Sequence, residues 1–472
     1  MRSPIACSLC ALLAAAPGVL AQGPAPSGYG ADAVADDTRL VAAMKRRDAA
    51  TVRELAAEGV GINAQDSETA AALHWAAHWN DLASVRVLLE AGADPNLANR
   101  FGVTPLHEAA TVNNAEMLTA MLQAGGNANA AFGAGETVLM TAARAGNAES
   151  VRALLAHGAD PEAVEGWHGQ TALMWAALEN HAEVIDLLVA AGADVNRAST
   201  KHDWIEISYS EGNVPKNRDL GGLTALQFGA RQGSIAAVEK LLDAGADASV
   251  AEPMYQLTAL QLAIVNGHYT VARKLMERGV GVDDGSLYLA VDTRNLGFYA
   301  QRANPPEKDG EVGNLDVIVA LLERGANPDL PYTKGIPERT VAGEIPVPPG
   351  ATPLDRAAVA SDFEAVEALL AGGANPAIAA EDGVTPLMLL VGHARKGRPP
   401  EVANDPRRQA AIRMLLERGA DVNAVLGDGN GALHIAALRG AADLVALLEE
   451  HGADSSLKNG AGQTPLDLLE GS

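Results

Sequence analysis

Apolar and polar positions follow one another along this chain in a unit of about 33 residues that recurs over most of its length. Each unit ends in the turn "GAD" or a close variant of it. The first three intervals between the first glycines of these turns are each 33 residues, and the next is 34. These glycines are Gly59, Gly92, Gly125, Gly158, Gly192, Gly245, Gly279, Gly325, Gly373, Gly419 and Gly452. The period predicts an array of stacked repeats.

The pattern within one unit predicts two short helices. A threonine such as Thr104 can cap the first helix, and the proline that follows it fits the first helical turn. Alanines later in this helix allow neighbouring helices to approach closely. After a polar turn, the segment "SVRVLLEAG" places apolar residues at helical spacing, and Gly92 closes it as a left-handed cap. Two short helices cannot bury their apolar faces alone, so the units must stack.

A second motif precedes most of these turns. It reads "AALHWAA" (71–77), "TPLHEAA" (104–110), "TVLMTAA" (137–143), "TALMWAA" (171–177), "TALQFGA" (224–230), "TALQLAI" (258–264), "TPLDRAA" (352–358), "TPLMLLV" (385–391) and "GALHIAA" (431–437). With the GAD turn, this pattern resembles the ankyrin-repeat family over residues 36–470. The resemblance implies an all-α solenoid of about eleven helix pairs with β-hairpin-like fingers between them. Residues 36–66 carry extra charge and lack the Thr-Pro start, as a capping repeat should.

Four insertions interrupt the period. Two lie between repeats, near residues 200–218 and 331–350, where the resembled fold has its fingers. Two lie within repeats, near residues 296–314 and 392–408. The insertion near 200–218 contains "WIEISY", whose alternating apolar residues favour a short hairpin. It either extends a finger over the groove of the solenoid or packs as a flap on its own repeats.

The N-terminal residues predict export. Arg2, an apolar stretch and "VLA" ending at Ala21 form a signal-peptide pattern over residues 1–21, and residues 22–35 are predicted to be a flexible mature N-terminus. Both cysteines, Cys7 and Cys10, lie in this leader, so the mature chain has no thiolate chemistry and no disulfide. The alanine- and glycine-rich composition favours a bacterial source, with the mature protein in the periplasm or secreted.

Charge and hydropathy limit the classes of partner. The net charge of −24 argues against nucleic acid, because a strongly negative field repels phosphates. No run of apolar residues after the leader reaches the 18 or so that a membrane span needs. These features favour a protein partner and a monomeric solenoid.

The candidate binding residues come from the resemblance. It implies that variable positions at and after the first helix face a concave groove, with the fingers beside it. All five tryptophans fall between residues 75 and 204, and exposed aromatic residues with interspersed arginine are typical of interface hot spots. Alternatively, Trp75 and Trp175 pack against the adjacent repeats as core. The candidates are Trp75, His78, Trp79, Arg100, Phe101, Glu108, Arg144, Trp167, Trp175, Glu179, Trp204, Tyr209, Phe228 and Arg231.

Signals for a metal site or an enzyme are weak. His74 and His78 are four residues apart and could share a helix face, but no third ligand is evident. The resemblance implies instead that His74, His107 and His434 tether neighbouring loops. No nucleophile elbow, zinc-protease motif or phosphate loop occurs. Asp292 and Arg294 could belong to a site built by the insertions, although an ordinary polar helix end is favoured.

The sequence therefore predicts a non-enzymatic scaffold that binds a partner protein through its groove and fingers, with no catalytic residue, cofactor or metal. Two alternatives stay open. One is a receptor for a small ligand that stacks on the aromatic residues, which requires a deep pocket under the finger near 200–218. The other is an enzyme whose site the four insertions build, which requires Asp, His or Arg residues that converge near residues 203, 292 and 393.

Overall fold

The computed structural model describes residues 37–201, 221–295, 308–334, 350–392 and 405–470. Within them the chain forms 23 α-helices and two short antiparallel hairpins. The expectation of an all-α repeat solenoid is confirmed. No helix in these ranges has the length and apolar character that a membrane crossing requires.

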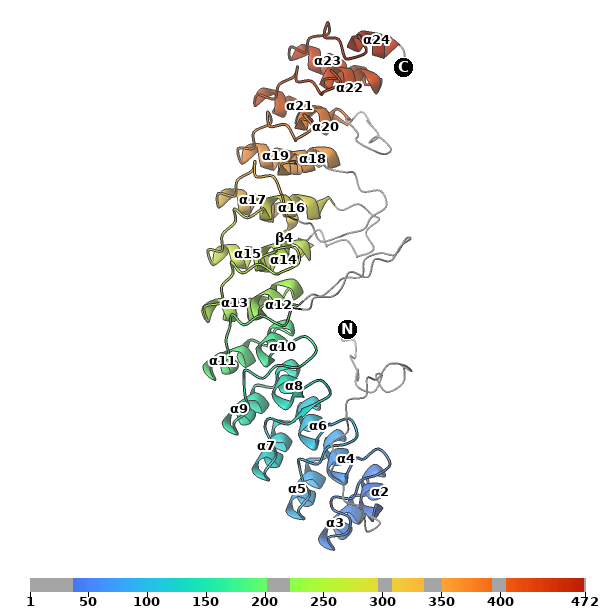
Figure 1. The fold of residues 1–472 in the computed structure, drawn as a ribbon, viewed down its shortest axis with the longest axis vertical. Helices are drawn as coiled ribbons and strands as arrows, with labels where there is room; N and C mark the ends of the chain where they lie inside the picture. Colours follow the sequence, from blue (N-terminus) through green and yellow to red (C-terminus); the bar gives the residue numbers. More distant parts are fainter. Residues whose placement is uncertain (1–36, 202–220, 296–307, 335–349, 393–404, 471–472) are drawn as a thin grey trace.

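The helices alternate between two layers (Figure 1). The first helices are α2 (Arg39–Lys45), α4 (Ala72–His78), α6 (Pro105–Thr111), α8 (Val138–Ala145), α10 (Ala172–Leu178), α12 (Ala225–Gln232), α14 (Ala259–Val265), α16 (Ser286–Arg294), α18 (Pro353–Ala360), α20 (Pro386–Leu390), α22 (Ala432–Leu438) and α24 (Pro465–Glu470). The second helices are α3 (Ala49–Ala57), α5 (Leu82–Glu90), α7 (Ala115–Gln123), α9 (Ala148–Ala156), α11 (Ala182–Ala190), α13 (Ile235–Asp243), α15 (Tyr269–Glu277), α17 (Asn314–Glu323), α19 (Phe363–Ala371), α21 (Pro406–Glu417) and α23 (Ala442–Glu450).

Among the described residues, eleven first helices are each followed by a second helix, and α24 stands alone after them. Each first helix packs on the first helix of the next repeat, and the second helices pack on one another in the same way. The stack is long and gently curved, with the first helices on its concave side (Figure 1). The predicted number of helix pairs is therefore confirmed.

The threonines that begin the first helices act as the sequence predicts. In α8, α10, α12, α14, α18 and α20 the threonine hydroxyl accepts a hydrogen bond from the backbone N–H three residues later. Thr104 differs, because its hydroxyl lies 2.9 Å from Nδ1 of His107, whose ring also accepts the Thr104 N–H. In each case an N–H group of the first turn, which has no partner inside the helix, is satisfied.

An asparagine four residues after the GAD glycine links successive repeats. The Asn96 amide donates to the carbonyl of Gly125 at 2.9 Å and accepts the N–H of Asn127 at 2.6 Å. Asn129 makes the equivalent pair of bonds one repeat later, to Gly158 and Asp160. This ladder of asparagine bonds satisfies backbone groups that follow α7 and α9, which explains why an asparagine recurs after the GAD turn.

The fingers between repeats contain short hairpin pairings. Strands β1 (Ala131–Phe132) and β2 (Glu136–Thr137) are antiparallel, with Ala131 opposite Thr137. Other fingers contain a single bridge, such as Gln65 with Ala71 and Val425 with Gly431. The expectation of hairpin-like fingers is thus met in the described part of the chain.

The insertions lie largely outside the described residues. One hairpin, β3 (Lys308–Asp309) with β4 (Val312–Gly313), belongs to the end of the insertion at 296–314 and leads into α17. Its Asp309 accepts the backbone N–H and the hydroxyl proton of Thr270, through Oδ2 and the carbonyl oxygen respectively. This hairpin therefore packs beside the first turn of α15.

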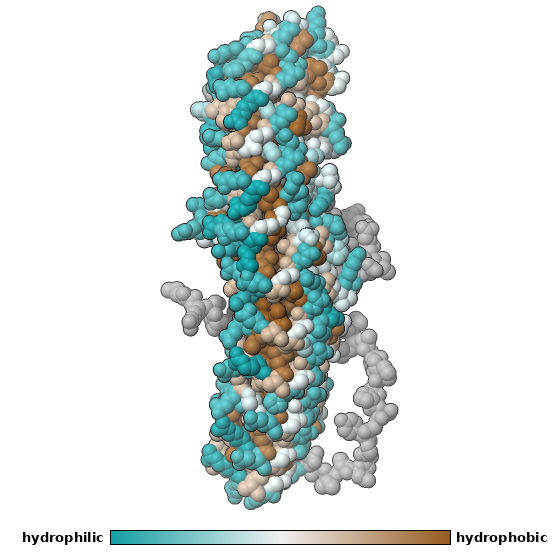
Figure 2. Space-filling view, turned by 90° about the vertical axis from the view of Figure 1, so that its left-hand side faces the viewer, coloured by the Kyte–Doolittle hydropathy of each residue, from teal (hydrophilic) through white to brown (hydrophobic). Residues whose placement is uncertain are grey.

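The core runs along the whole stack and is built mainly of alanine, leucine and valine. On the face of the second helices, apolar side chains form a narrow stripe between polar ones (Figure 2). Ion pairs cross this face from one repeat to the next, as between Arg152 and Glu183 and between Lys240 and Asp186. These side chains are roughly half exposed, so each pair adds little stability.

Candidate functional site

Five predicted or neighbouring residues gather at the N-terminal end of the concave side. They are Lys45, Arg47, Trp75, His78 and Trp79, which we call the N-terminal aromatic cluster. The centroids of the two indole rings are 6.2 Å apart, and the imidazole of His78 lies 4.8 Å from the ring of Trp79. The cluster joins the turn after α2 to the end of α4.

Trp75 is half-buried and held from two sides. Its indole Nε1–H donates to Oδ2 of Asp66 at 3.2 Å. Lys45 lies over the ring, with Nζ 4.7 Å from the centroid, and forms an ion pair of 2.6 Å with the same carboxylate. Trp75 also packs on the core and is only partly buried, so it is a neighbour of the core, as one of the two interpretations of this residue expects.

His78 links α4 to α6, the first helix of the next repeat. Its Nδ1 lies 3.2 Å from a carboxylate oxygen of Glu108, the predicted groove residue of α6. The hydrogen bond with Glu108 is the main cause that raises the pKa of His78, against the effect of burial. The pair therefore favours the imidazolium form on this face.

Trp79 is the exposed aromatic ring of the cluster, with 37% of its surface accessible. The guanidinium of Arg47 lies over its ring at 4.1 Å from the centroid. A cation over an indole face at this distance is attracted by the ring quadrupole. The stacking holds a large aromatic surface in place where solvent can reach it.

A second aromatic pair lies further along the concave side. Arg144 of α8 lies over Trp175 of α10, 5.0 Å from the centroid, and forms an ion pair with Glu136 of the finger at 3.2 Å. Trp175 is half-buried, and its indole N–H has no hydrogen-bond partner among the described residues. Glu179, which follows α10, is exposed. Two predicted residues, Arg144 and Trp175, are thus brought together here.

The fingers expose two aromatic residues of their own. Phe101 is 48% exposed and Trp167 is 64% exposed. Arg100 lies over Phe101 and pairs with Glu68 of the preceding finger. Glu165 is buried, and its carboxylate accepts three backbone N–H groups of its finger, including that of Trp167. Sequence reasoning missed Glu165, although it stands where other fingers have Asp or Asn.

One prediction was wrong and two others lie outside the described residues. Phe228 is only 3% exposed, so its ring belongs to the core and does not face the groove. It occupies the repeat position of Trp75 and Trp175, but at this repeat the ring is covered. Arg231 lies 5.4 Å from that ring on the same helix. Trp204 and Tyr209 fall in 202–220 and are not described.

Comparison with known proteins shows the family to which this chain belongs. A family model for ankyrin repeats in three copies matches residues 39–131, 106–199 and 202–285. A second model, for ankyrin repeats in many copies, matches residues 415–469. The chain belongs to the ankyrin-repeat family. The helix pairs, GAD turns and fingers described above are therefore the parts of ankyrin repeats.

Several curated ankyrin-repeat proteins are similar over part of this solenoid. Ankyrin repeat and SOCS box protein 16 of Mus musculus is 35% identical over 116 residues, 25% of this chain and 24% of the relative. Ankyrin repeat and SAM domain-containing protein 6 of Danio rerio is 32% identical over 172 residues, 34% of this chain and 23% of the relative. The chain thus spans about a quarter of the length of these relatives.

A third relative carries the name of an enzyme. The putative palmitoyltransferase ZDHHC13 of Danio rerio is 28% identical over 250 residues, which is 52% of this chain and 32% of that protein. The similarity leaves most of that relative unmatched. Its name therefore describes that protein and gives no activity to this ankyrin solenoid.

Two of the three motif histidines, His74 and His434, tether neighbouring ankyrin repeats, whereas Nε2 of His107 is buried with no hydrogen-bond partner among the described residues. Nδ1 of His74 accepts the N–H of Ala71 at 3.1 Å, and Nε2 lies 3.1 Å from the carbonyl oxygen of Val103 in the next finger. Burial lowers the pKa of His74, which keeps the ring neutral. Both ring nitrogens are occupied, so His74 is not free to bind a metal with His78. No group of three or more potential metal ligands occurs in the described ranges.

Asp292 lies in a buried ion pair inside the stack. Its Oδ1 accepts Nε–H of Arg356 from the next first helix at 2.7 Å, and both side chains are almost fully buried. The same guanidinium donates to the carbonyl of Asn295, the residue that caps α16. The carboxylate thus fixes one ankyrin repeat to the next, as expected of a polar helix end.

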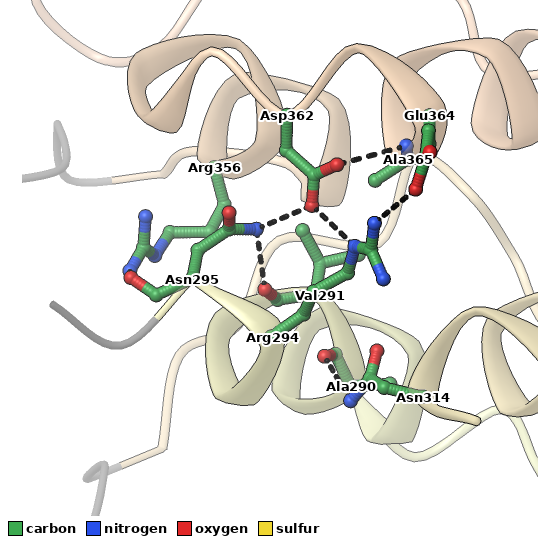
Figure 3. Close-up of polar contacts among 9 residues, drawn as sticks. All are labelled: Ala290, Val291, Arg294, Asn295, Asn314, Arg356, Asp362, Glu364 and Ala365. Carbon is green, nitrogen blue, oxygen red and sulfur yellow. Dashed lines mark hydrogen bonds and ion pairs between the residues drawn. The ribbon is translucent and has the colours of Figure 1, made fainter. Parts of the chain in front are cut away.

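Arg294 and Asn295 meet the start of α19 (Figure 3). Arg294 Nε donates to Oδ2 of Asp362 at 2.8 Å, and its Nη2 pairs with Glu364. The Asn295 amide donates to the same Oδ2 at 3.0 Å. Asp362 also caps α19 through Oδ1, which accepts the N–H of Ala365. The network ties α16 to the repeat that follows it.

Proposed function

We propose that this ankyrin-repeat chain is a non-enzymatic scaffold that holds a partner protein against its first helices and fingers. The observation that carries the proposal is a set of exposed aromatic side chains fixed by their neighbours. Trp79 lies under Arg47, Phe101 lies under Arg100, and Trp167 extends from a finger held by Glu165. Rigid, exposed aromatic residues lose little conformational freedom when a partner covers them.

The charges around these rings also support a protein partner. Arginine and carboxylate side chains alternate with the aromatic residues along the concave side. Aromatic residues and arginine are enriched in protein interfaces, and carboxylates are more common at their polar rim. The small-ligand receptor depends on a pocket under residues 202–220, which lie outside the described residues. The candidate acid of the enzyme alternative, Asp292, is engaged in a buried ion pair.

Affinity capture from an extract of the source organism tests the proposal. The wild-type chain and a Trp79→Ala, Trp167→Ala variant serve as baits, because both side chains are exposed and their loss leaves the core intact. Leu438→Ala is the matched control. This exposed residue ends first helix α22 at the repeat position of His78, far along the stack.

If the proposal is correct, the wild-type and Leu438→Ala baits should both retain a protein that the double tryptophan variant does not retain. Circular dichroism should show the same helix content for all three baits. If the three baits capture the same proteins in equal amounts, the concave side of the N-terminal half is not the binding surface. If wild type captures nothing beyond an empty matrix, the scaffold proposal itself is wrong.

We propose further that the protein is exported and acts as a monomer, without contact with nucleic acid. The signal pattern of residues 1–21 supports export to the periplasm or the medium of a bacterial cell. The net charge of −24 supports the absence of nucleic-acid partners. Mass spectrometry of the protein purified from cell fractions should find an N-terminus at Gln22, whereas Met1 in a cytoplasmic fraction would contradict export. Light scattering after gel filtration should give the mass of one chain.

A further inference from the structure

Three pairs on the concave side have the same construction. A cation from one repeat lies over the aromatic ring of the next repeat. Lys45 lies over Trp75, Arg47 over Trp79 and Arg144 over Trp175, at 4.7, 4.1 and 5.0 Å from the ring centroids. Because the cation and the ring come from different repeats, each pair is fixed by the stacking of the solenoid.

Two of these pairs contain a third partner, a carboxylate from a finger. Asp66 pairs with Lys45 at 2.6 Å, and Glu136 pairs with Arg144 at 3.2 Å. In both cases the carboxylate neutralises a cation that lies against an aromatic face. The complete unit is therefore cation, ring and carboxylate.

The pair formed by Arg47 and Trp79 lacks the carboxylate. In the described part of the chain Arg47 has no ion pair, and the neighbouring Arg46 has none either, although both are exposed. The nearby acids are engaged elsewhere: Asp48 caps α3 and Glu108 pairs with His78. The indole N–H of Trp79 makes no hydrogen bond with any described residue. Arg47 thus lies over an exposed ring without a carboxylate partner among the described residues, and a second exposed arginine, Arg46, precedes it in the chain.

The backbone at Arg47 is also unfavourable for an arginine. Its φ is 56°, in the left-handed region. Asn80, Asn113 and Asn180 occupy the equivalent turn position of later repeats, with φ of 55°, 61° and 63°. Asparagine tolerates this region better than arginine. The backbone conformation of this turn therefore favours asparagine. We infer that the arginine at position 47 has a role for its side chain.

We propose that Arg46, Arg47 and Trp79 form a docking site for an acidic segment of a partner protein. An aspartate or glutamate side chain of the partner supplies the missing carboxylate to Arg47, and an adjacent apolar group covers the indole. The charge of the rest of the chain strengthens this assignment. In a protein of net charge −24, two exposed arginines that have no ion pair among the described residues form a local site at which an acidic segment is attracted rather than repelled.

This inference rests on the proposed function and names the chemistry of the partner. The test is selection from a random peptide display library against the full chain. Wild type should enrich peptides that carry aspartate or glutamate, and Arg47→Glu should enrich peptides that carry lysine or arginine instead. Arg53→Glu is the matched control, because Arg53 is also exposed and lies nearby on the second helix α3. That variant should select the same peptides as wild type.

A second variant separates binding from folding. Arg47→Asn removes the charge and places in the turn the residue that later repeats have there. Binding of a peptide recovered with wild type should weaken about 10-fold or more, as expected for loss of a charge-assisted hydrogen bond. The helix content should be unchanged.

The outcomes distinguish this inference from the function on which it rests. If wild type recovers peptides without acidic preference, or if Arg47→Glu recovers the same peptides, the acidic docking site is wrong while protein binding stands. If wild type recovers no peptide at all, the acidic docking site is wrong, and affinity capture from the extract decides the binding function separately. Acidic enrichment that reverses with Arg47→Glu and persists with Arg53→Glu supports the site.

Discussion

Replacement of Asp362 by alanine should loosen the solenoid more than loss of an ordinary helix cap. Asp362 is the N-cap of α19, and its other carboxylate oxygen accepts hydrogen bonds from Arg294 and Asn295 of the preceding repeat (Figure 3). Asp81 occupies the same position before α5 but bonds only to Ser84. Asp81→Ala is therefore a control that removes a cap and a local bond from the Ser84 hydroxyl, but no bond to another repeat among the described residues.

The magnitudes follow from the bonds that each variant loses. Loss of the cap costs about 1 kcal/mol at either site. At Asp362 the bonds from Arg294 and Asn295 add about 2 kcal/mol, from hydrogen bonds to a charged group. Asp362 is 8% exposed and Arg294 is 27% exposed, so solvent screens this pair only partly, although Arg294 keeps Glu364 as a partner. We expect about 3 kcal/mol for Asp362→Ala against about 1 kcal/mol for Asp81→Ala.

Hydrogen exchange measured by mass spectrometry suits this comparison better than global unfolding. Long repeat arrays can unfold in parts, and exchange reports the opening of each segment separately. Peptides from α19 in Asp362→Ala should exchange faster relative to wild type than peptides from α5 in Asp81→Ala. The difference of about 2 kcal/mol corresponds to roughly a 30-fold larger increase in rate.

Asp362→Asn provides an internal check. Asparagine is a good N-cap but carries no charge, so its effect on α19 should fall between those of wild type and Asp362→Ala. If Asp362→Ala and Asp81→Ala accelerate exchange in their own helices by the same factor, the bonds from Arg294 and Asn295 add no stability. The hydrogen bonds from Arg294 and Asn295 to Asp362 would then not hold the two repeats together.

Three further predictions concern single side chains. Burial raises the pKa of Asp355 to about 6, so the folded state keeps this proton at a higher pH than the unfolded state does. The free energy of unfolding should therefore fall as pH rises from about 4 to about 6. Urea unfolding should show that Asp355→Asn removes this slope and raises the free energy of unfolding at pH 7 by about 1–2 kcal/mol. Glu108 raises the pKa of His78, so the stability that this pair adds is present at low pH and lost as pH rises through the folded pKa. Glu108→Gln should lower the pKa of His78 measured by NMR, and an unchanged titration would contradict the pairing. Asn96→Ala removes two bonds between repeats and should cost about 1–2 kcal/mol of local stability, measured by exchange.

Local features of this ankyrin fold could be predicted because they depend on neighbours in the chain. The period of the GAD turns gave the number of helix pairs, and the threonines and Gly92 gave helix ends. Gly92 adopts φ of 89°, as its predicted role as a left-handed cap requires. Each of these rests on bonds and backbone angles within a few residues, which the sequence displays directly.

The ladder of asparagines was missed although the sequence contains its signal. Asn96, Asn129, Asn196 and Asn423 recur four residues after a GAD glycine. Their bonds reach the following repeat, as from Asn96 to Gly125. A recurring polar residue at a fixed offset could have indicated a bond of this kind, but only the stacked structure shows its partner.

The candidate site was predicted only in part, for a physical reason. The repeat places Trp75, Trp175 and Phe228 at one position, but the structure leaves the first two half-exposed and buries the third. The exposure of a side chain depends on which groups from other repeats cover it. Likewise, Arg294 and Asp362 are 68 residues apart in the chain and 2.8 Å apart in space.

The sequence by itself determined the family pattern and the helix pairs, because these follow from local periodicity and capping. The tertiary structure decided which aromatic residues reach solvent and which arginines have a carboxylate partner, and it leaves Arg47 without an ion pair among the described residues. Those properties arise where successive repeats meet, and stacking brings together residues whose spacing in the chain carries no record of the contact.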